Sequence, residues 1–183
     1  MNRTANTRRS NRGFTLVELC ASVGICAALL GQAVPAMGTM RQQQQLRVSA
    51  DTLASDLRLA RSEAARLGDS VFFRISGKGA NACYVMYIGA KDDCDCAGGK
   101  AACKKPSSQV IKAEWLPTTQ PVRLSSNAET LQFQYLQGLV TQAGSIDLSL
   151  SGGQSIRQVV ALTGRVRSCY VGTNKVSGMP KCA

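Results

Sequence analysis

The sequence predicts an α+β fold in which a long N-terminal helix packs on antiparallel β-sheets. Two helical patterns come first: an apolar run from Phe14 to Val34, and then a stretch with an apolar residue at every third or fourth position. From residue 71 onward, short segments alternate apolar and polar side chains between Gly-containing turns, which is typical of antiparallel strands. The 183 residues are enough for one domain with one core.

The run from Phe14 to Val34 has the roughly 20 apolar residues that a helix needs to span a bilayer. Its one charged side chain is Glu18, and a carboxylate inside such a run is costly, which points to a function. The preceding segment carries arginines at positions 3, 8, 9 and 12 and no acid. This bias predicts a cytoplasmic N-terminus and an exported remainder. We expect a leader at residues 1–13 and a transmembrane helix at residues 14–40.

Pro35 is expected to kink the helix without ending it. An amphipathic helix is predicted to follow at residues 41–68, with Gly68 as its C-cap. Its apolar stripe consists of Leu46, Ala50, Leu53, Leu57, Ala60, Ala64 and Leu67. Its polar face consists of Arg47, Asp51, Asp56, Arg58, Arg61 and Arg66. The stripe requires a covering surface, and the β-rich domain at residues 69–183 is the part of the chain that can provide it.

Six segments of that domain are predicted to be strands. They are Val71–Ser76, Cys83–Ile88, Val110–Leu116, Thr130–Gln137, Ser145–Leu150 and Ile156–Leu162. In the fourth segment, Leu131, Phe133 and Tyr135 are expected to share one face. The polar, Lys-rich segment from Lys91 to Ser108 is expected to be a loop.

Eight cysteines divide into two in the first helix, Cys20 and Cys26, and six in the β-rich domain. An even number in an exported domain predicts disulfides, but six cysteines allow 15 connectivities. We favour the pair Cys169–Cys182, which encloses a short Gly-containing segment, and leave the pairing of Cys83, Cys94, Cys96 and Cys103 open. Their spacing lacks two CxxC arms, so no metal site is predicted.

No catalytic residue or cofactor is expected. The sequence has no His, which removes the commonest general base and metal ligand. Asp92, Asp93 and Asp95 lack the spacing of a calcium loop, so we expect a solvated cluster. The net charge of +11 favours a polyanionic partner, either nucleic acid or an anionic membrane surface. A basic surface without any such partner is the alternative.

The segment Gly13-Phe14-Thr15-Leu16-Val17-Glu18 resembles the prepilin cleavage motif of type IV pilins and type II secretion pseudopilins. The resemblance implies a pilin-like fold, cleavage after Gly13 by prepilin peptidase, and methylation of the new amino group on Phe14. It also implies that Glu18 pairs with the N-terminal amine of a neighbouring subunit during filament assembly. A carboxylate in lipid is stabilised by such an ammonium partner. The alternative is a simple signal anchor with a stray Glu.

Within these families, Leu53 to Ala64 resembles the stem of the group that contains minor pilin FimT and pseudopilin GspH. Phe133, Gly138 and the segment from Thr163 to Arg167 also resemble this group. In FimT-type pilins of naturally competent bacteria, a Gly-Arg-x-Arg motif is implicated in DNA binding, which implies this role for Gly164, Arg165 and Arg167. Residues two apart in an extended segment project to the same side, and two guanidiniums there can bind neighbouring phosphates.

The resemblance therefore implies a minor pilin that binds the DNA backbone without sequence preference and supports DNA uptake in natural transformation. Lys175 and Lys181 would add charge, Lys104, Lys105 and Arg123 would extend the surface, and Tyr170 is a candidate for base stacking. Inner-membrane anchoring, a periplasmic domain and assembly at the pilus surface or tip follow from the family. The alternatives are a GspH-like pseudopilin of a type II secretion system, or a structural minor pilin without DNA binding. In both, Arg165 and Arg167 are ordinary solvated or ion-paired strand residues.

Overall fold

The computed structural model describes residues 15–79 and 81–182, with the side chains of 32–36 left out. The chain divides into two compact units, Met1–Met40 and Arg41–Ala183. One helix, α1 (Leu16–Leu67), contributes to both units and continues through residue 35 without a break in its helical assignment. Among the described residues, no helix is both long enough and apolar enough to cross a membrane. The predicted membrane span at 14–40 is therefore not confirmed.

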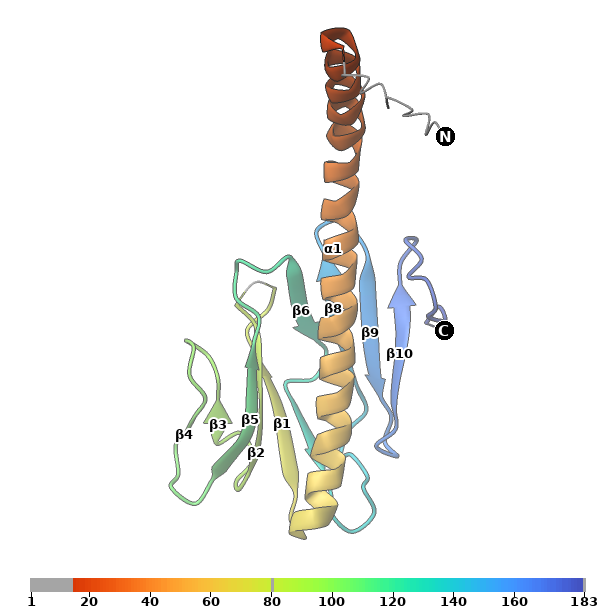
Figure 1. The fold of residues 1–183 in the computed structure, drawn as a ribbon. Coiled ribbons are helices and arrows are strands. Elements are labelled where there is room, and N and C mark those ends of the chain that lie inside the picture. Colours follow the sequence, from red (N-terminus) through yellow and green to blue (C-terminus); the bar gives the residue numbers. More distant parts are fainter. Residues whose placement is uncertain (1–14, 80, 183) are drawn as a thin grey trace, which may run out of the picture. The chain divides into compact units, whose positions relative to one another are not determined.

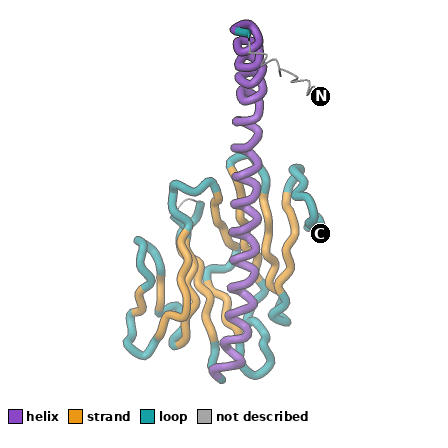
Figure 2. The backbone as a smooth tube through the Cα atoms, viewed as in Figure 1, coloured by secondary structure: helices purple, strands orange, loops and turns teal. Residues whose placement is uncertain are grey.

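The second unit consists of the distal half of α1 and three antiparallel sheets (Figures 1 and 2). The first sheet has the order β5-β2-β1-β7 and the second the order β10-β9-β8-β6. A third, two-stranded sheet pairs β3 with β4. The strands are β1 (Val71–Ser76), β2 (Cys83–Ile88), β3 (Cys94–Asp95), β4 (Ala102–Cys103), β5 (Gln109–Trp115), β6 (Val122–Ser126), β7 (Thr130–Phe133), β8 (Gly144–Leu150), β9 (Ser155–Val160) and β10 (Val166–Val171).

The apolar stripe of α1 packs against the inner faces of the two larger sheets, as the sequence predicts. Leu46, Leu53 and Leu57 are fully buried, and they join one core with side chains from both sheets. Only Leu67, at the end of the stripe, is exposed. The predicted fold class is confirmed.

The Cys-rich segment is not the plain loop that the sequence predicts. A disulfide from Cys83 of β2 to Cys96 ties the segment to the first sheet, and a second disulfide, Cys94–Cys103, joins β3 to β4 within the ribbon. A second apolar cluster forms there, between the outer face of this sheet and the ribbon. Strand β2 is consequently buried on both faces, which explains its nearly continuous apolar sequence.

Three further predictions about the elements are wrong. The fourth predicted strand ends at Phe133, four residues early, because the chain turns back at Gly138, and Tyr135 is exposed instead of sharing the inner face. Asp56, predicted to lie on the polar face of the helix, is buried and accepts hydrogen bonds from Tyr84 Oη at 2.8 Å and Lys112 Nζ at 2.7 Å. The predicted set also omits β6 and β10.

Candidate nucleic-acid interface

The β9–β10 turn places the Gly-Arg-x-Arg segment at an edge of the second sheet. The Gly164 N–H donates to the Ala161 carbonyl at 2.8 Å, and the Ala161 N–H donates to the Arg165 carbonyl at 3.0 Å. Gly164 has a φ of +73°, in the left-handed region that favours glycine. It is buried, so its part in any binding is to shape the turn and not to contact a ligand.

Arg165 and Arg167 are both exposed, one just before β10 and the other within it. Strand β10 is an edge strand, and Arg167 pairs in register with Val159 of β9. The neighbouring residues Val166 and Tyr170 pack against the core. Arg167 therefore lies on the outer face of the sheet, away from α1. Neither arginine forms an ion pair within the described part of the chain.

A hollow of about 590 Å³ lies on this outer face beside Arg167. Its lining contains three cationic side chains, Arg157, Arg167 and Lys181, and no carboxylate. Arg157 donates two hydrogen bonds, of 2.7 and 2.8 Å, to Asp147, which is not part of the lining. These bonds raise the pKa of Arg157 above its ordinary value. Arg167 and Lys181 therefore supply the positive charge of the hollow that is not neutralised by a salt bridge.

The C-terminal segment forms one wall of this hollow. Residues 180–182 run parallel to β10: the Tyr170 N–H donates to the Pro180 carbonyl at 2.9 Å, and the Cys182 N–H donates to the Tyr170 carbonyl at 3.0 Å. The structure contains the predicted disulfide between Cys169 and Cys182. The disulfide fixes Lys181 beside the edge strand, while Lys175 is exposed outside the hollow lining.

The other candidates for this surface are distributed differently. Arg123 is exposed on β6, at the opposite edge of the same sheet. Lys104 and Lys105 lie just beyond β4, where the Lys105 N–H donates to the Asp93 carboxylate at 3.1 Å. Tyr170 is half-buried and packs against the core, so its ring is not free to stack on a base.

Sequence reasoning missed one residue beside the turn, Arg61 of α1. A Cβ atom added to Gly138 would lie 2.7 Å from Arg61 Nε, and one added to Gly164 would lie 3.2 Å from the same atom. The guanidinium of Arg61 is thus in contact with the backbone of both glycine turns. A helical arginine near two turns distant in sequence gives no local pattern, so only the fold brings them together.

The acidic residues of the Cys-rich segment are engaged within the protein. Asp92 accepts hydrogen bonds from Arg74 and Thr130. Burial raises the pKa of Asp95, but hydrogen bonds from Ser76, Ala97 and Cys96 outweigh it and leave the pKa below its ordinary value. The prediction of a solvated cluster is therefore wrong for Asp93, which is buried, and right only in part for Asp92 and Asp95, whose side chains are about half exposed but also held by structural contacts.

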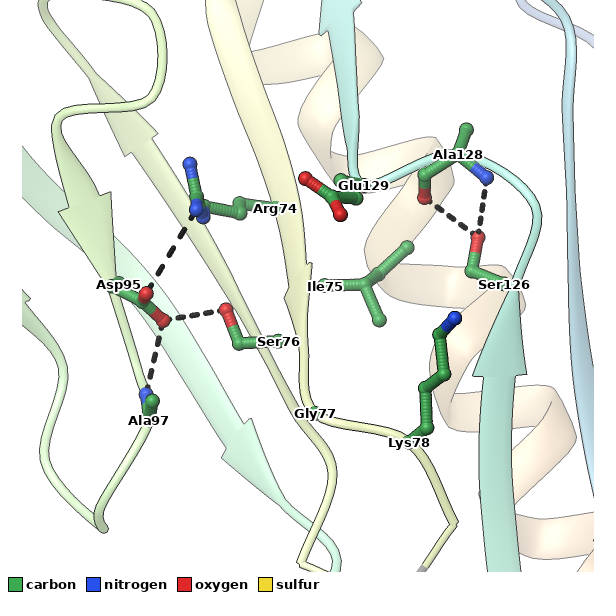
Figure 3. Close-up of a pocket in the computed structure, with 10 residues that line it drawn as sticks. All are labelled: Arg74, Ile75, Ser76, Gly77, Lys78, Asp95, Ala97, Ser126, Ala128 and Glu129. Atoms are coloured by element: carbon green, nitrogen blue, oxygen red, sulfur yellow. Dashed lines mark hydrogen bonds and ion pairs between the residues drawn. The ribbon is translucent and has the colours of Figure 1, made fainter.

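Figure 3 shows the hollow beside Asp95, with a volume of about 310 Å³. Its lining balances Arg74 and Lys78 against Asp95 and Glu129. The Asp95 carboxylate accepts a hydrogen bond from Ser76 and lies 3.9 Å from the Arg74 guanidinium. The balanced charge and these internal contacts do not favour a polyanion here, in contrast to the hollow at β10.

The predicted cleavage residues Gly13 and Phe14 lie outside the described residues. Glu18 is described, and it lies exposed in the first turn of α1. Its N–H donates to Thr15 Oγ1 at 3.3 Å, so Thr15 caps the helix. A carboxylate in a first turn is also stabilised by the helix dipole. Within one chain, Glu18 therefore has a helix-capping context besides the filament role that the resemblance implies.

A helix stem packed on antiparallel sheets is the pilin-like architecture, and it defines the class of this chain as a pilin or pseudopilin subunit. The family model described as type II transport protein GspH matches residues 49–164. This is more than half of the chain, which therefore belongs to that family. The predicted membership of the FimT/GspH group is confirmed. The match ends at Gly164, so Arg165 and Arg167 lie just beyond it.

Solved structures of a minor pilin and a minor pseudopilin are similar to this chain. The type IV minor pilin FimU of Pseudomonas aeruginosa is 18% identical, with a TM-score of 0.47 over 68% of this chain and 87% of that one. The minor pseudopilin EpsH from the Type 2 Secretion System of Vibrio cholerae is 16% identical, with a TM-score of 0.45 over 68% of this chain and 95% of that one. No curated protein matches the sequence significantly. Similarity at this distance does not transfer a function.

Proposed function

We propose that this chain is a minor type IV pilin of the FimT kind that binds the DNA backbone at the β10 edge and supports DNA uptake in natural transformation. The observation that carries the proposal is the pair Arg165 and Arg167, exposed at the start of the edge strand β10, one just before it and one within it, and free of any acid partner among the described residues. Residues two apart in an extended segment span about 7 Å, which is close to the rise of two base pairs, so a pair at the start of β10 can contact neighbouring phosphates.

The expected binding is electrostatic and insensitive to sequence. Arg165, Arg167 and Lys181 follow the edge of one sheet, and an edge strand can lie along a duplex backbone. Contacts with phosphates release counterions, so the affinity should fall with salt by about 0.9 logarithmic units per contact and per tenfold increase in salt. Phosphate contacts carry no sequence information, so we expect no sequence preference from these three cations.

The proposal also includes the family's route to the filament. Prepilin peptidase would cut after Gly13 and methylate Phe14, and residues 14–40 would anchor the chain in the inner membrane. The domain at 41–183 would then lie in the periplasm. On assembly with other pilin subunits, Glu18 would meet the amine of a neighbour, and the β10 edge would be carried at the pilus surface or tip.

The test is a titration of fluorescent duplex DNA with the full chain in detergent, with disulfides intact, at two salt concentrations. Arg165→Gln/Arg167→Gln should lower the affinity by roughly tenfold per lost contact near 0.1 M salt and reduce the salt slope by about 1.8. Arg58→Gln/Arg123→Gln removes the same charge from exposed sites away from β10 and serves as the matched control. Equal losses in both double variants would reject the site, and no binding by the wild type would reject the function.

The second candidate is a GspH-like pseudopilin that builds a type II secretion filament without nucleic acid. The observation that favours it is the family match itself, whose description is a type II transport protein. In this function, Arg165 and Arg167 would be solvated or would pair with acidic residues of a neighbouring subunit. A loss of secretion in the Arg165→Gln/Arg167→Gln strain with DNA uptake intact would select this candidate.

A further inference from the structure

The residue at issue is Arg61, which is held against the turn that presents Arg165. The neighbouring side chains of α1 are engaged within the domain: Ala60 and Ala64 are in the core, and Arg66 forms an ion pair with Glu63 at 2.6 Å. Arg61 is exposed and forms no hydrogen bond or ion pair within the described part of the chain. Its position is therefore set by packing, and its charge is left without a partner.

The packing that positions Arg61 depends on two glycines in left-handed conformations, Gly138 with φ +61° and Gly164 with φ +73°. The Gly138 carbonyl oxygen lies only 2.2 Å from where a Gly164 Cβ would be, so the two turns are in close contact. Arg61 Nε lies over this junction, 2.7 and 3.2 Å from the two hypothetical Cβ positions. A side chain at either glycine would displace the guanidinium from the turn.

We infer that Arg61 is a third phosphate-binding residue of the proposed DNA site, so that the site extends from strand β10 onto helix α1. This inference rests on the proposed function. Arg165 follows Gly164 directly, so the Arg61 guanidinium lies beside the turn that carries Arg165, while Arg167 continues the site along the outer face of β10. A pre-positioned guanidinium loses little conformational freedom on binding, and its bonds to phosphate are charge-assisted.

Gly138 and Gly164 leave the space that the Arg61 side chain occupies. Because neither glycine has a Cβ, the Arg61 side chain of α1 can lie against the β7–β8 and β9–β10 turns where these touch. Other arginines of the described chain that fix the fold donate to acceptors: Arg47 to the Ser177 carbonyl and Arg157 to Asp147, for example. Arg61 has contacts that position it but no acceptor, as expected of a residue whose acceptor is on a ligand.

The experiment compares Arg61→Gln, Arg61→Lys and Arg58→Gln in the full chain, using the duplex DNA titration over a series of salt concentrations. Arg58 is a matched control because it is also exposed on α1 and has no acceptor within the described residues, but its atoms are not among those nearest to the glycine turns. Arg61→Gln should weaken binding several-fold and lower the salt slope by about 0.9. Arg61→Lys should keep the slope, since the charge remains, and Arg58→Gln should match the wild type.

The outcomes separate the inference from the function on which it rests. Wild-type binding that is lost in Arg165→Gln/Arg167→Gln and unchanged in Arg61→Gln would overturn the inference alone. Equal slope losses in Arg61→Gln and Arg61→Lys would also overturn it, because they would assign Arg61 a packing role. A wild type that does not bind DNA would reject the function and the inference together. Thermal unfolding of each variant monitors whether the fold is retained.

Discussion

Substituting Gly164 by Ala should destabilise the domain through two separable effects. Alanine at a φ of +73° costs about 1–2 kcal/mol. The new Cβ would also lie 2.2 Å from the Gly138 carbonyl oxygen, and moving a backbone atom out of the way costs about 1–3 kcal/mol. The sum for Gly164→Ala is about 2–5 kcal/mol of unfolding free energy.

Gly178→Ala isolates the first effect. Gly178 has a similar φ of +77°, but a Cβ there meets nothing within 4 Å. Gly178→Ala should therefore lower the unfolding free energy by about 1–2 kcal/mol. For a unit of this size, each kcal/mol corresponds to about 3 °C in Tm. We expect a decrease of about 6–15 °C for Gly164→Ala and about 3–6 °C for Gly178→Ala.

The assay is thermal unfolding followed by circular dichroism, with disulfides intact, together with the DNA titration. Gly164→Ala should also reduce the salt slope, because it displaces Arg61, while Gly178→Ala should leave the slope unchanged. Equal decreases in Tm for the two variants would refute the close contact between the turns. A loss of stability in Gly164→Ala without any change in slope would refute the link between this contact and the cationic surface.

Three further perturbations test other parts of the structure. Asp56→Ala leaves the buried Tyr84 hydroxyl and the half-exposed Lys112 without their acceptor. We expect the free energy of unfolding, measured with urea, to fall by about 2–4 kcal/mol. Asp56→Asn keeps an acceptor and should lower it less. Burial and the bond to Asp56 raise the pKa of Tyr84, so the unfolded chain releases this proton first, and stability should fall as the pH rises above about 10; Tyr84→Phe should flatten this part of the pH profile. Cys169→Ser/Cys182→Ser should lower stability by about 2–4 kcal/mol and weaken DNA binding, because Lys181 is released from the edge strand; unchanged affinity would exclude Lys181 from the site.

The elements that sequence could predict are those with a periodic signal. The α1 stripe repeats over seven positions, and β1, β2 and β8 are regular apolar segments between turns, so their positions were correct to within a residue. Strands β3 and β4 have two residues each and exist because disulfides hold them, which no periodicity reveals. The burial of Asp56 could not be predicted, because its partners Tyr84 and Lys112 are 28 and 56 residues away.

For the candidate site, sequence could predict the exposed arginines and the Cys169–Cys182 bond but not the surface that they join. Lys181 reaches this surface through a parallel bridge to β10, and Arg61 reaches it through contact with two turns. Both placements are tertiary. Glu18 is a different case: Thr15 and Glu18 have the spacing of a capping box, and this local signal could have been recognised in the sequence.

The distribution of arginine partners bears on the choice between the two candidate functions. Arg66, Arg74 and Arg157 have carboxylate partners within the chain, whereas Arg61 beside the β9–β10 turn, Arg165 in that turn and Arg167 on β10 have no such partner in the described residues. A neighbouring subunit that neutralised them would have to present carboxylates in one fixed register. DNA presents phosphates at regular intervals in every register. A salt dependence of DNA affinity that decreases when each of these three arginines is substituted, together with no preference for DNA sequence, would therefore favour DNA over a protein partner.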